Sequence, residues 1–182
     1  MISRKEALDL VKEHVSNRNL IKHMIATEGV MHRLARHFGE DEDKWGITGL
    51  LHDLDYDYTA DDFPRHGYMT AEMLSEYDVP EDCLQAIRVH PGHIPAETLF
   101  EKALYAGDPI TGLIVAAALM HPKKKIAALD VDFLERRFKE KRFAAGASRE
   151  QISSCADMGI ELQDFFRLSL EGMNEMSKEL GL

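Results

Sequence analysis

Apolar residues recur every three or four positions along most of the chain, the spacing of helices that bury one face. Near the start, Ser3 and Glu6 form an S-x-x-E capping box ahead of such a stretch. A second amphipathic segment runs from about residue 19 to 38 and stops at Gly39, because glycine commonly ends helices. A third follows the capping residues 41–43 and continues to residue 51. The first third of the chain therefore predicts three helices.

Proline and glycine divide the middle of the chain. The acidic, tyrosine-rich stretch 55–62 is expected to be a loop. Pro64 is expected to open a helix that reaches Tyr77, since proline is tolerated in the first turn. Another helix is predicted from residue 80 to 90, where a Pro-Gly pair ends it.

The remaining segments also carry helical patterns. Residues 98–120 are apolar and predicted to be helical, with breaks at 107–109 and at 112. Three further helices are predicted after Pro122, around residues 132–141, 149–157 and 161–180. No stretch alternates apolar and polar residues for long enough to demand a sheet. We therefore predict one all-α domain over residues 1–182.

Composition narrows the class of protein. The chain has 182 residues, 45% of them hydrophobic, so it can bury one substantial core without disulfides. Its 22 Lys and Arg against 32 Asp and Glu give a net charge of −10, which argues against binding a nucleic-acid duplex. The two Cys form no CxxC, so no thiolate metal site is expected.

The chain shows no targeting pattern. Its first dozen residues are charged and helix-patterned, unlike a signal peptide. Its longest apolar run, Leu113–Met120, is far below the roughly 20 residues of a membrane span. We expect a cytoplasmic protein that binds no membrane, and the oligomeric state stays open.

Nine histidines are the unusual feature of the composition. Four of them and two aspartates start from core-facing ends of different predicted helices: His23, His52, Asp53, His66, His90 and Asp108. Each alone has an ordinary explanation, since a lone core histidine is usually hydrogen-bonded, an HD dipeptide occurs by chance, and Asp-Pro can start a helix. Buried together and unpaired they would be costly, and converging on cations would satisfy all of them.

The order H…HD…H…H…D resembles the HD superfamily of metal-dependent phosphohydrolases. The matching segments are His23, Leu50-Leu51-His52-Asp53-Leu54-Asp55, Arg65-His66-Gly67, Ala86-Ile87-Arg88-Val89-His90 and Lys102-Ala103-Leu104-Tyr105-Ala106-Gly107-Asp108. They are similar to HD enzymes with extra histidines for a second metal, including those that split dinucleoside polyphosphates. Gly107 stands where alanine is common, which leaves the following aspartate in place.

The resemblance covers about residues 20–120 and implies an HD-type helical bundle with its metal-binding core there. Residues 123–182 would then form helices that pack on this core. The last third, including residues 139–146, is similar to HDIG-type hydrolases, a subfamily without an assigned substrate.

The resemblance also implies a ligand set, with His23, His52 and Asp108 around one ion and His66 and His90 around a second. We place Asp53 between the ions, because each carboxylate oxygen can bind a different metal. Imidazoles and carboxylates without thiolates suit Mn or Fe, with Co, Ni or Zn as further candidates. Two such ions can share a water and lower its pKa, so that this metal-bound water attacks a phosphoester or phosphoanhydride.

The expected substrate is a small phosphorylated molecule such as a nucleotide. Because the chain is acidic, local cations must contact the phosphate, and the candidates nearest the ligands are Arg65, Arg88 and Lys102. A second basic cluster could fold over the site; its members are Lys139, Lys141, Arg142 and Arg149.

Other polar residues near the ligands are candidates for supporting roles. Alongside Asp53, His93 is a candidate catalytic residue that would donate a proton to the leaving group. Asp55 and Asp57 could orient ligand imidazoles through hydrogen bonds. A solvated loop explains each of these three residues equally well.

Two other functions use the same residues. Some HD-fold enzymes hold two irons in a similar site and act as oxygenases, which iron dependence and oxygen consumption would reveal. A non-catalytic module would keep the site for binding nucleotides, which tight binding without turnover would reveal. Hydrolysis of a phosphorylated small molecule is the function that we predict first.

Overall fold

The computed structural model describes residues 1–182 and consists of helices joined by turns, with no strand. The α-helices are α1 (Arg4–His14), α2 (Arg18–Phe38), α3 (Glu42–Leu51), α4 (Tyr56–Thr59), α5 (Tyr68–Leu74), α6 (Glu81–Val89), α7 (Leu99–Met120), α8 (Val131–Lys139), α9 (Arg149–Ser153), α10 (Leu162–Glu175) and α11 (Ser177–Leu180). Short 3-10 turns lie between them: η1 (Phe63–Arg65), η2 (Ile126–Ala128) and η3 (Ser154–Met158). The predicted all-α fold class is confirmed.

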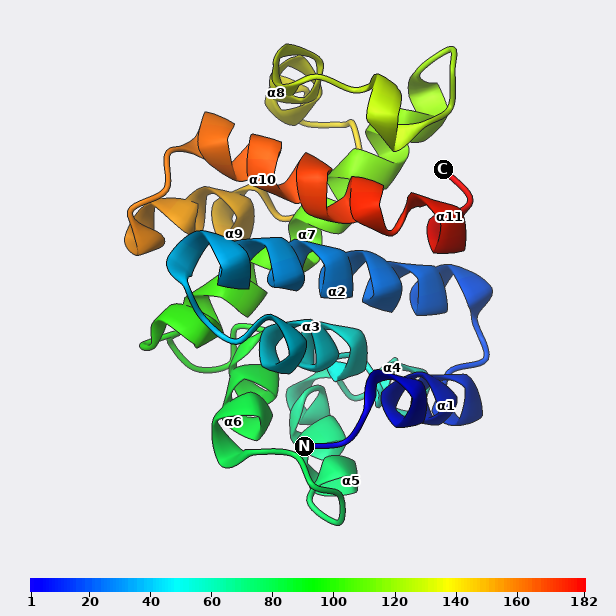
Figure 1. Cartoon of the computed structure of the whole chain (residues 1–182), viewed down its shortest axis with the longest axis vertical. Helices are drawn as coiled ribbons and strands as arrows, with labels where there is room; N and C mark the ends of the chain where they lie inside the picture. Colours follow the sequence, from blue (N-terminus) through cyan, green and yellow to red (C-terminus); the bar gives the residue numbers. More distant parts are fainter.

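Helix α2 crosses the middle of the molecule, with α3 and α1 on one side and α10 and α11 on the other (Figure 1). It packs against α3, α10 and α7, and most of its second half is buried. One contiguous core of 44 buried residues extends through all these helices. The C-terminal helices thus pack directly on α2 and α7.

Two glycines let α2 and α10 approach closely. A Cβ atom on Gly29 would lie 2.6 Å from the carbonyl oxygen of Gly172, and one on Gly172 would lie 2.3 Å from the oxygen of Gly29. No larger residue fits at either position without moving a helix. This crossing fixes the C-terminal helices against the helix that carries His23.

A buried carboxylate ties α1 and α11 to α2. The Glu28 side chain has no solvent exposure, and its two oxygens accept hydrogen bonds of 2.5 and 2.9 Å from Arg4. The same guanidinium also pairs with Glu179 at 3.0 Å. A buried charge must be paired, so this link holds both ends of the chain on α2.

Helix α7 is the most apolar helix. By length and composition alone it could cross a membrane, although 56% of its most apolar window is buried inside the fold. It packs against α2, α6, α8 and α9 and carries Asp108 at its middle. Burial of this kind is typical of the central helix of a globular domain.

The predicted helices in the first third of the chain are confirmed within a residue or two. The capping box of Ser3 and Glu6 is present, and α2 ends at Gly39. The side chain of Asp41 caps α3 by accepting a hydrogen bond from the amide of Lys44. The helix from residue 80 to 90 is confirmed as α6.

Three predictions in the middle of the chain were wrong. The stretch 55–62 is not only a loop, because it contains the single turn of α4. The helix expected from Pro64 to Tyr77 is split into η1 and α5 by Gly67, whose φ of +79° no helix accommodates. Helix α7 has no break at residues 107–109 or 112, since burial on several sides outweighs the backbone bond that Pro109 removes.

The C-terminal helices are shorter than predicted. The segment expected at 149–157 is α9 followed by the 3-10 turn η3. The long helix expected at 161–180 divides into α10 and α11 around Met176. Helix α8 begins one residue before the predicted range 132–141 and ends two residues short of it.

Candidate metal centre

Four histidines and two aspartates from five separate parts of the chain meet in one cluster. His23 lies on α2, His52 and His90 directly follow α3 and α6, and His66 follows η1. Asp53 comes next after His52, and Asp108 lies in the middle of α7. All six candidate ligands therefore lie together. The prediction that Asp108 lies at a helix end was wrong, because α7 continues through Pro109.

One half of the cluster joins α2, α3 and α7. The Nε2 atom of His23 lies 3.0 Å from Oδ1 of Asp108 and 3.2 Å from Nε2 of His52. The His52 Nε2 atom lies 3.7 Å from the same Asp108 oxygen. The donor atoms of these three residues lie within 4.8 Å of one another, close enough to share one ion.

The other half surrounds Asp53. Its Oδ1 atom lies 3.3 Å from Nε2 of both His66 and His90 and 3.4 Å from Nε2 of His52. Its Oδ2 atom lies 3.5 Å from Nε2 of His23. Each oxygen of the one carboxylate therefore faces different histidines. His52, Asp53 and His90 form a second group with donor atoms within 4.8 Å.

The outward nitrogen of each ring is held by the protein. The Nδ1 atoms of His52 and His90 lie 2.8 and 2.6 Å from the carbonyl oxygens of Gly49 and Ile87. The Nδ1 atom of His23 lies 2.8 Å from Oγ1 of Thr111, whose own hydrogen is donated to the carbonyl of Asp108. Since these oxygens accept hydrogen bonds, each Nδ1 carries the proton and each neutral ring presents an Nε2 lone pair to the cluster.

Asp55 orients the fourth ring. Its Oδ1 atom accepts a hydrogen bond of 2.7 Å from Nδ1 of His66. Its Oδ2 atom accepts hydrogen bonds from the backbone amides of Gly67 at 2.8 Å and Thr70 at 3.0 Å. This agrees with the predicted role of Asp55. Asp57 does not reach the cluster, because its carboxylate binds the amide and hydroxyl of Ser16 instead.

The carboxylates shift the pKa values of the rings in the metal-free protein. Burial lowers the pKa of His23, but the hydrogen bonds to Asp108 and Asp53 outweigh it and raise that pKa to about 10. Burial likewise lowers the pKa of His66, which Asp53 and Asp55 raise to about 9. The pKa of His90 is lowered, chiefly by burial.

The imidazoles act on the carboxylates in the opposite direction. Burial raises the pKa of Asp53, but the charge of His52 and hydrogen bonds from the other rings hold it well below its usual range. The pKa of Asp108 is also lowered, since His23 and His52 outweigh its burial. Both carboxylates are therefore anionic at neutral pH.

This donor set fits metal cations. Two pairs of inward nitrogens face each other, His23 and His52 at 3.2 Å and His66 and His90 at 3.3 Å. Facing lone pairs are compatible only with a proton or another cation between them. Nitrogen and carboxylate donors with no sulfur are the ligands of Mn, Fe and related divalent metals. The residues present can thus hold a metal, and protons take its place in the metal-free protein.

A cavity of about 360 Å³ opens over the cluster, and five of its eleven lining residues are candidate ligands. The sequence did not predict that six other residues line this cavity: Leu20, Tyr56, Phe63, Pro91, Gly146 and Gln151. Tyr56 and Phe63 are exposed aromatic residues, 47% and 57% accessible, at the mouth of the cavity. Exposed aromatic residues in the acidic stretch were the available signal; nothing in the sequence marks Gly146 or Gln151.

The segment between α8 and α9 covers one side of this cavity. Gly146 lines the cavity, and Arg149 holds the segment by donating hydrogen bonds to six backbone carbonyls between residues 137 and 147. Because Nε, Nη1 and Nη2 of Arg149 all donate to these carbonyls, Arg149 holds the segment and does not bind phosphate. Lys139 pairs with Glu135, while Lys141 and Arg142 are exposed and unpaired. The segment therefore reaches the cavity through Gly146, and none of its four basic side chains lines the cavity.

The four remaining candidates lie around the cluster rather than in it. His93 lines a neighbouring cavity of about 480 Å³ together with Lys102, and its Nε2 atom lies 3.2 Å from the carbonyl oxygen of His66. Lys102 makes no ion pair. Arg65 is exposed beside His66, and Arg88 pairs with Glu81 at 2.6 Å. None of the four lines the cavity over the cluster.

Comparison with known proteins places this cluster in a family. The HD domain family matches residues 20–127, which include all six clustered residues. A symmetrical bis(5'-nucleosyl)-tetraphosphatase of Bacillus subtilis (strain 168) is 28% identical over 132 residues, covering 60% of this chain and 69% of that protein.

Ribonuclease Y proteins are also similar to this chain. That of Oleidesulfovibrio alaskensis is 24% identical over 96 residues, covering 53% of this chain, and that of Nitratiruptor sp. is 26% identical over 135 residues, covering 72% of this chain. The matched parts are only 18% and 26% of those two ribonucleases. No solved structure gives a significant match.

The family match spans more than half of the chain, and the clustered residues follow the H…HD…H…H…D order within it. The chain therefore belongs to the HD domain family of metal-dependent phosphohydrolases.

Proposed function

We propose that this protein uses two divalent metal ions to hydrolyse a phosphoester or phosphoanhydride in a small, nucleotide-like molecule. One observation carries the proposal: four inward Nε2 atoms and two anionic carboxylates form one cluster, and three of these histidines and both carboxylates line an open cavity. The relatives support it, since a nucleosyl tetraphosphatase and a ribonuclease both cleave bonds to phosphorus in nucleotides or their polymers.

His23, His52 and Asp108 would hold one ion, and His66 and His90 the other, with Asp53 shared. Bound there, two ions supply Lewis acidity and a water of lowered pKa at neutral pH. The chain's own contribution is to fix the ring orientations through their Nδ1 atoms, which keeps every Nε2 lone pair aimed inward. Asp53 is the residue that joins both halves of the site.

The mouth of the cavity favours a nucleotide-like substrate. Tyr56 and Phe63 present exposed aromatic faces next to His66, at ring separations of 5.7 and 5.8 Å. A nucleobase stacked on such a face gains about 1–3 kcal/mol. Lys102 and His93, in the neighbouring cavity, are the groups that we assign to a distal phosphate and to proton donation. Arg65 remains a candidate phosphate contact, whereas Arg88 is engaged with Glu81.

The test is hydrolysis by Mn-loaded protein of ADP, diadenosine tetraphosphate and bis(p-nitrophenyl) phosphate, under air and without oxygen. We expect turnover of at least one substrate in both conditions. Asp53→Ala should lower it by about a hundredfold or more, as loss of metal activation costs several kcal/mol. Phe63→Ala should raise KM for the nucleotide about tenfold.

Absence of hydrolysis with Mn, Fe, Co, Ni and Zn would overturn the proposal. Consumption of oxygen by the iron-loaded protein, with no phosphate released, would instead support a di-iron oxygenase. Tight nucleotide binding without any turnover would support a non-catalytic module.

A further inference from the structure

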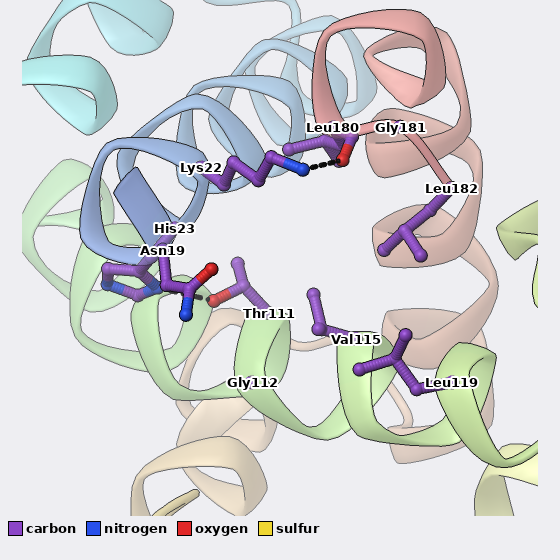
Figure 2. Close-up of a pocket in the computed structure, with 10 residues that line it drawn as sticks. All are labelled: Asn19, Lys22, His23, Thr111, Gly112, Val115, Leu119, Leu180, Gly181 and Leu182. Atoms are coloured by element: carbon purple, nitrogen blue, oxygen red, sulfur yellow. Dashed lines mark hydrogen bonds between the residues drawn. The ribbon is translucent and has the colours of Figure 1, made fainter. Parts of the chain in front are cut away.

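A second cavity adjoins the metal centre on the far side of His23. It is a groove of about 490 Å³ between α2, α7 and the residues that follow α11, within the size range of small-molecule sites. Figure 2 shows its two ends. Asn19, His23 and Thr111 lie at one end, and Val115, Leu119 and Leu182 lie at the other. We call this cavity the α2–α7 groove.

The groove shares lining residues with the cavities at the metal site. His23 lines the cavity over the metal centre, a smaller cavity beside Asp108, and the groove itself. Gly112 lines both the smaller cavity and the groove. A ligand held at His23 and Asp108 by its phosphate can therefore extend along Gly112 into the groove.

Gly112 is not explained by the fold. It lies inside α7 in a helical conformation, where glycine costs about 1 kcal/mol relative to alanine. A Cβ atom there would meet only the Cβ of Ala147, at 4.0 Å, so no neighbour requires its absence. The missing side chain instead keeps open the passage from Asp108 to the groove. This is an independent sign that something passes along this face of α7.

The wall beyond Gly112 is aliphatic. Val115 and Leu119 follow at helical spacings of three and seven residues, and Leu119 is 54% exposed. Leu182 closes the opposite side. No Asp, Glu or aromatic residue lines the groove. An uncharged, largely apolar group is the occupant that this wall would bind.

The groove also has polar lining. The side chain of Asn19 lies at the same end as His23 and has no partner within the protein (Figure 2). The ammonium group of Lys22 lies farther along, where it donates a hydrogen bond of 2.6 Å to the carbonyl of Leu180 and makes no ion pair (Figure 2). An unused carboxamide beside His23 suits the phosphate oxygens or hydroxyl of a ligand whose apolar part lies deeper in the groove.

We propose that the α2–α7 groove binds the uncharged organic group of the phosphorylated substrate while its phosphate lies at the metal centre. This rests on the proposed function and adds to the substrate a sizeable, mainly apolar group that is distinct from a nucleobase stacked on Tyr56 and Phe63. The group would enter past Gly112 and contact Val115 and Leu119.

Binding of a graded probe series tests this directly. Calorimetry would compare inorganic phosphate, methyl phosphate, octyl phosphate and adenosine 5'-monophosphate on the full-length Mn-loaded protein. We expect octyl phosphate or the nucleotide to bind about tenfold or more tightly than methyl phosphate, because each buried methylene adds to affinity. Whichever of the two gains more identifies the organic group as an alkyl chain or a nucleoside.

Two variants locate the gain in the groove. Gly112→Leu should fill the passage and reduce the gain to within about twofold, without lowering the melting temperature, because leucine favours helices and its Cβ atom would meet only the Cβ of Ala147, at 4.0 Å. Leu119→Ser should reduce the gain partly by removing apolar contact. The matched control is Ala116→Leu, which adds the same side chain to α7 outside the groove and should leave the series unchanged.

Equal binding of all four probes would overturn the inference, as would a gain that persists in Gly112→Leu. These outcomes differ from failure of the proposed function. A protein that binds the series as expected but hydrolyses no phosphate would keep the groove and lose the hydrolase. A protein that hydrolyses small phosphates but binds all probes equally would keep the hydrolase function and lose the groove.

Discussion

Each imidazole of the metal centre is oriented by the ring nitrogen that faces away from it. Backbone carbonyls hold His52 and His90, and a threonine hydroxyl holds His23, so these three partners are neutral. His66 alone is held by a carboxylate, that of Asp55. An anionic partner makes an imidazole more basic and a stronger metal ligand. Asp55 therefore matters most for the ion that His66 binds.

Asp55→Asn tests this role. The amide keeps the shape of the side chain but removes its charge, so we expect the affinity for the ion at His66 to fall about 10- to 100-fold. The other ion should keep its affinity. Titration with Mn, followed by calorimetry, measures both. Asp57→Asn is the control, since Asp57 binds only Ser16 and is two residues away on the same turn. Equal effects of the two substitutions would contradict the assignment.

At this scale the sequence predicted which residues meet but not where every side chain points. The six clustered residues follow from the helix ends and the HD motif. Arg88 was predicted to contact phosphate because it is close to His90 in the sequence. Its side chain instead pairs with Glu81, two helical turns earlier on the same face of α6. His93 follows the turn at residues 91–92, in which Gly92 has a φ of +87°, and it lines the neighbouring cavity instead of the one over the cluster.

Among the structural elements, the segment between α8 and α9 is held in an unusual way. It has only a turn-rich backbone from residue 140 to 148, and six of the carbonyls around it converge on Arg149 at 2.5 to 3.4 Å. One guanidinium thus replaces the hydrogen bonds that a helix would supply. The segment places Gly146 against the metal cavity and Ala147 beside Asp108.

Arg149→Met should loosen this segment. It removes the donors of several partly buried carbonyls, so we expect a loss of about 2–3 kcal/mol in the free energy of unfolding. Faster proteolysis between residues 140 and 148 should accompany it. Denaturant unfolding and mass mapping of the fragments measure the two effects. Arg142→Met is the control, because Arg142 is exposed and makes no ion pair. Unchanged proteolysis in Arg149→Met would refute this role.

Helix boundaries were predictable where a local signal acts alone and unpredictable where tertiary packing competes with it. Caps at Ser3 and Asp41 fixed the starts of α1 and α3. Pro109 is a strong local signal for a break, but α7 is buried among α2, α6 and α9 and continues through it. At Gly67 the reverse happens, because a helix predicted to continue is interrupted. The Gly67 amide donates a hydrogen bond to Asp55, and its positive φ separates η1 from α5.

For the whole molecule, the negative charge of the buried carboxylates makes the metal centre take up either protons or metal ions from the solution. The chain carries a net charge of −10, and the centre adds two buried carboxylates that need compensation. In the metal-free protein, protons on His23 and His66 supply it. Metal ions and protons therefore compete for the same nitrogen atoms.

This competition predicts a pH dependence of metal affinity. The pKa of His23 is about 10 and that of His66 about 9 in the metal-free protein, so both rings are protonated at pH 7. Each must lose its proton to bind a metal. The affinity should thus rise with pH between 6 and 9, roughly tenfold per unit for each proton displaced. Calorimetry in buffers of different ionisation enthalpy would count the protons. A metal affinity that does not change with pH would contradict the protonation of His23 and His66 in the metal-free protein.

The sequence did not predict how the last third of the chain contributes to the site. That segment supplies Gly146 and Gln151 to the metal cavity and the residues after α11 to the α2–α7 groove. Among the contacts that position this part of the chain is the close crossing of α2 and α10 at Gly29 and Gly172. A crossing between residues so far apart in sequence leaves no pattern in a single chain.

The metal content of the purified protein tests the central claim most directly. Elemental analysis should be made on protein prepared without chelators or a metal-affinity tag. We predict about two transition-metal ions per chain, lost in His52→Ala and in Asp53→Ala. His32→Ala is the control and should keep both ions, because His32 packs on Gly46 and Glu28, away from the cluster. A wild-type protein that holds no such metal, and takes up none when Mn or Fe is added, would contradict the account.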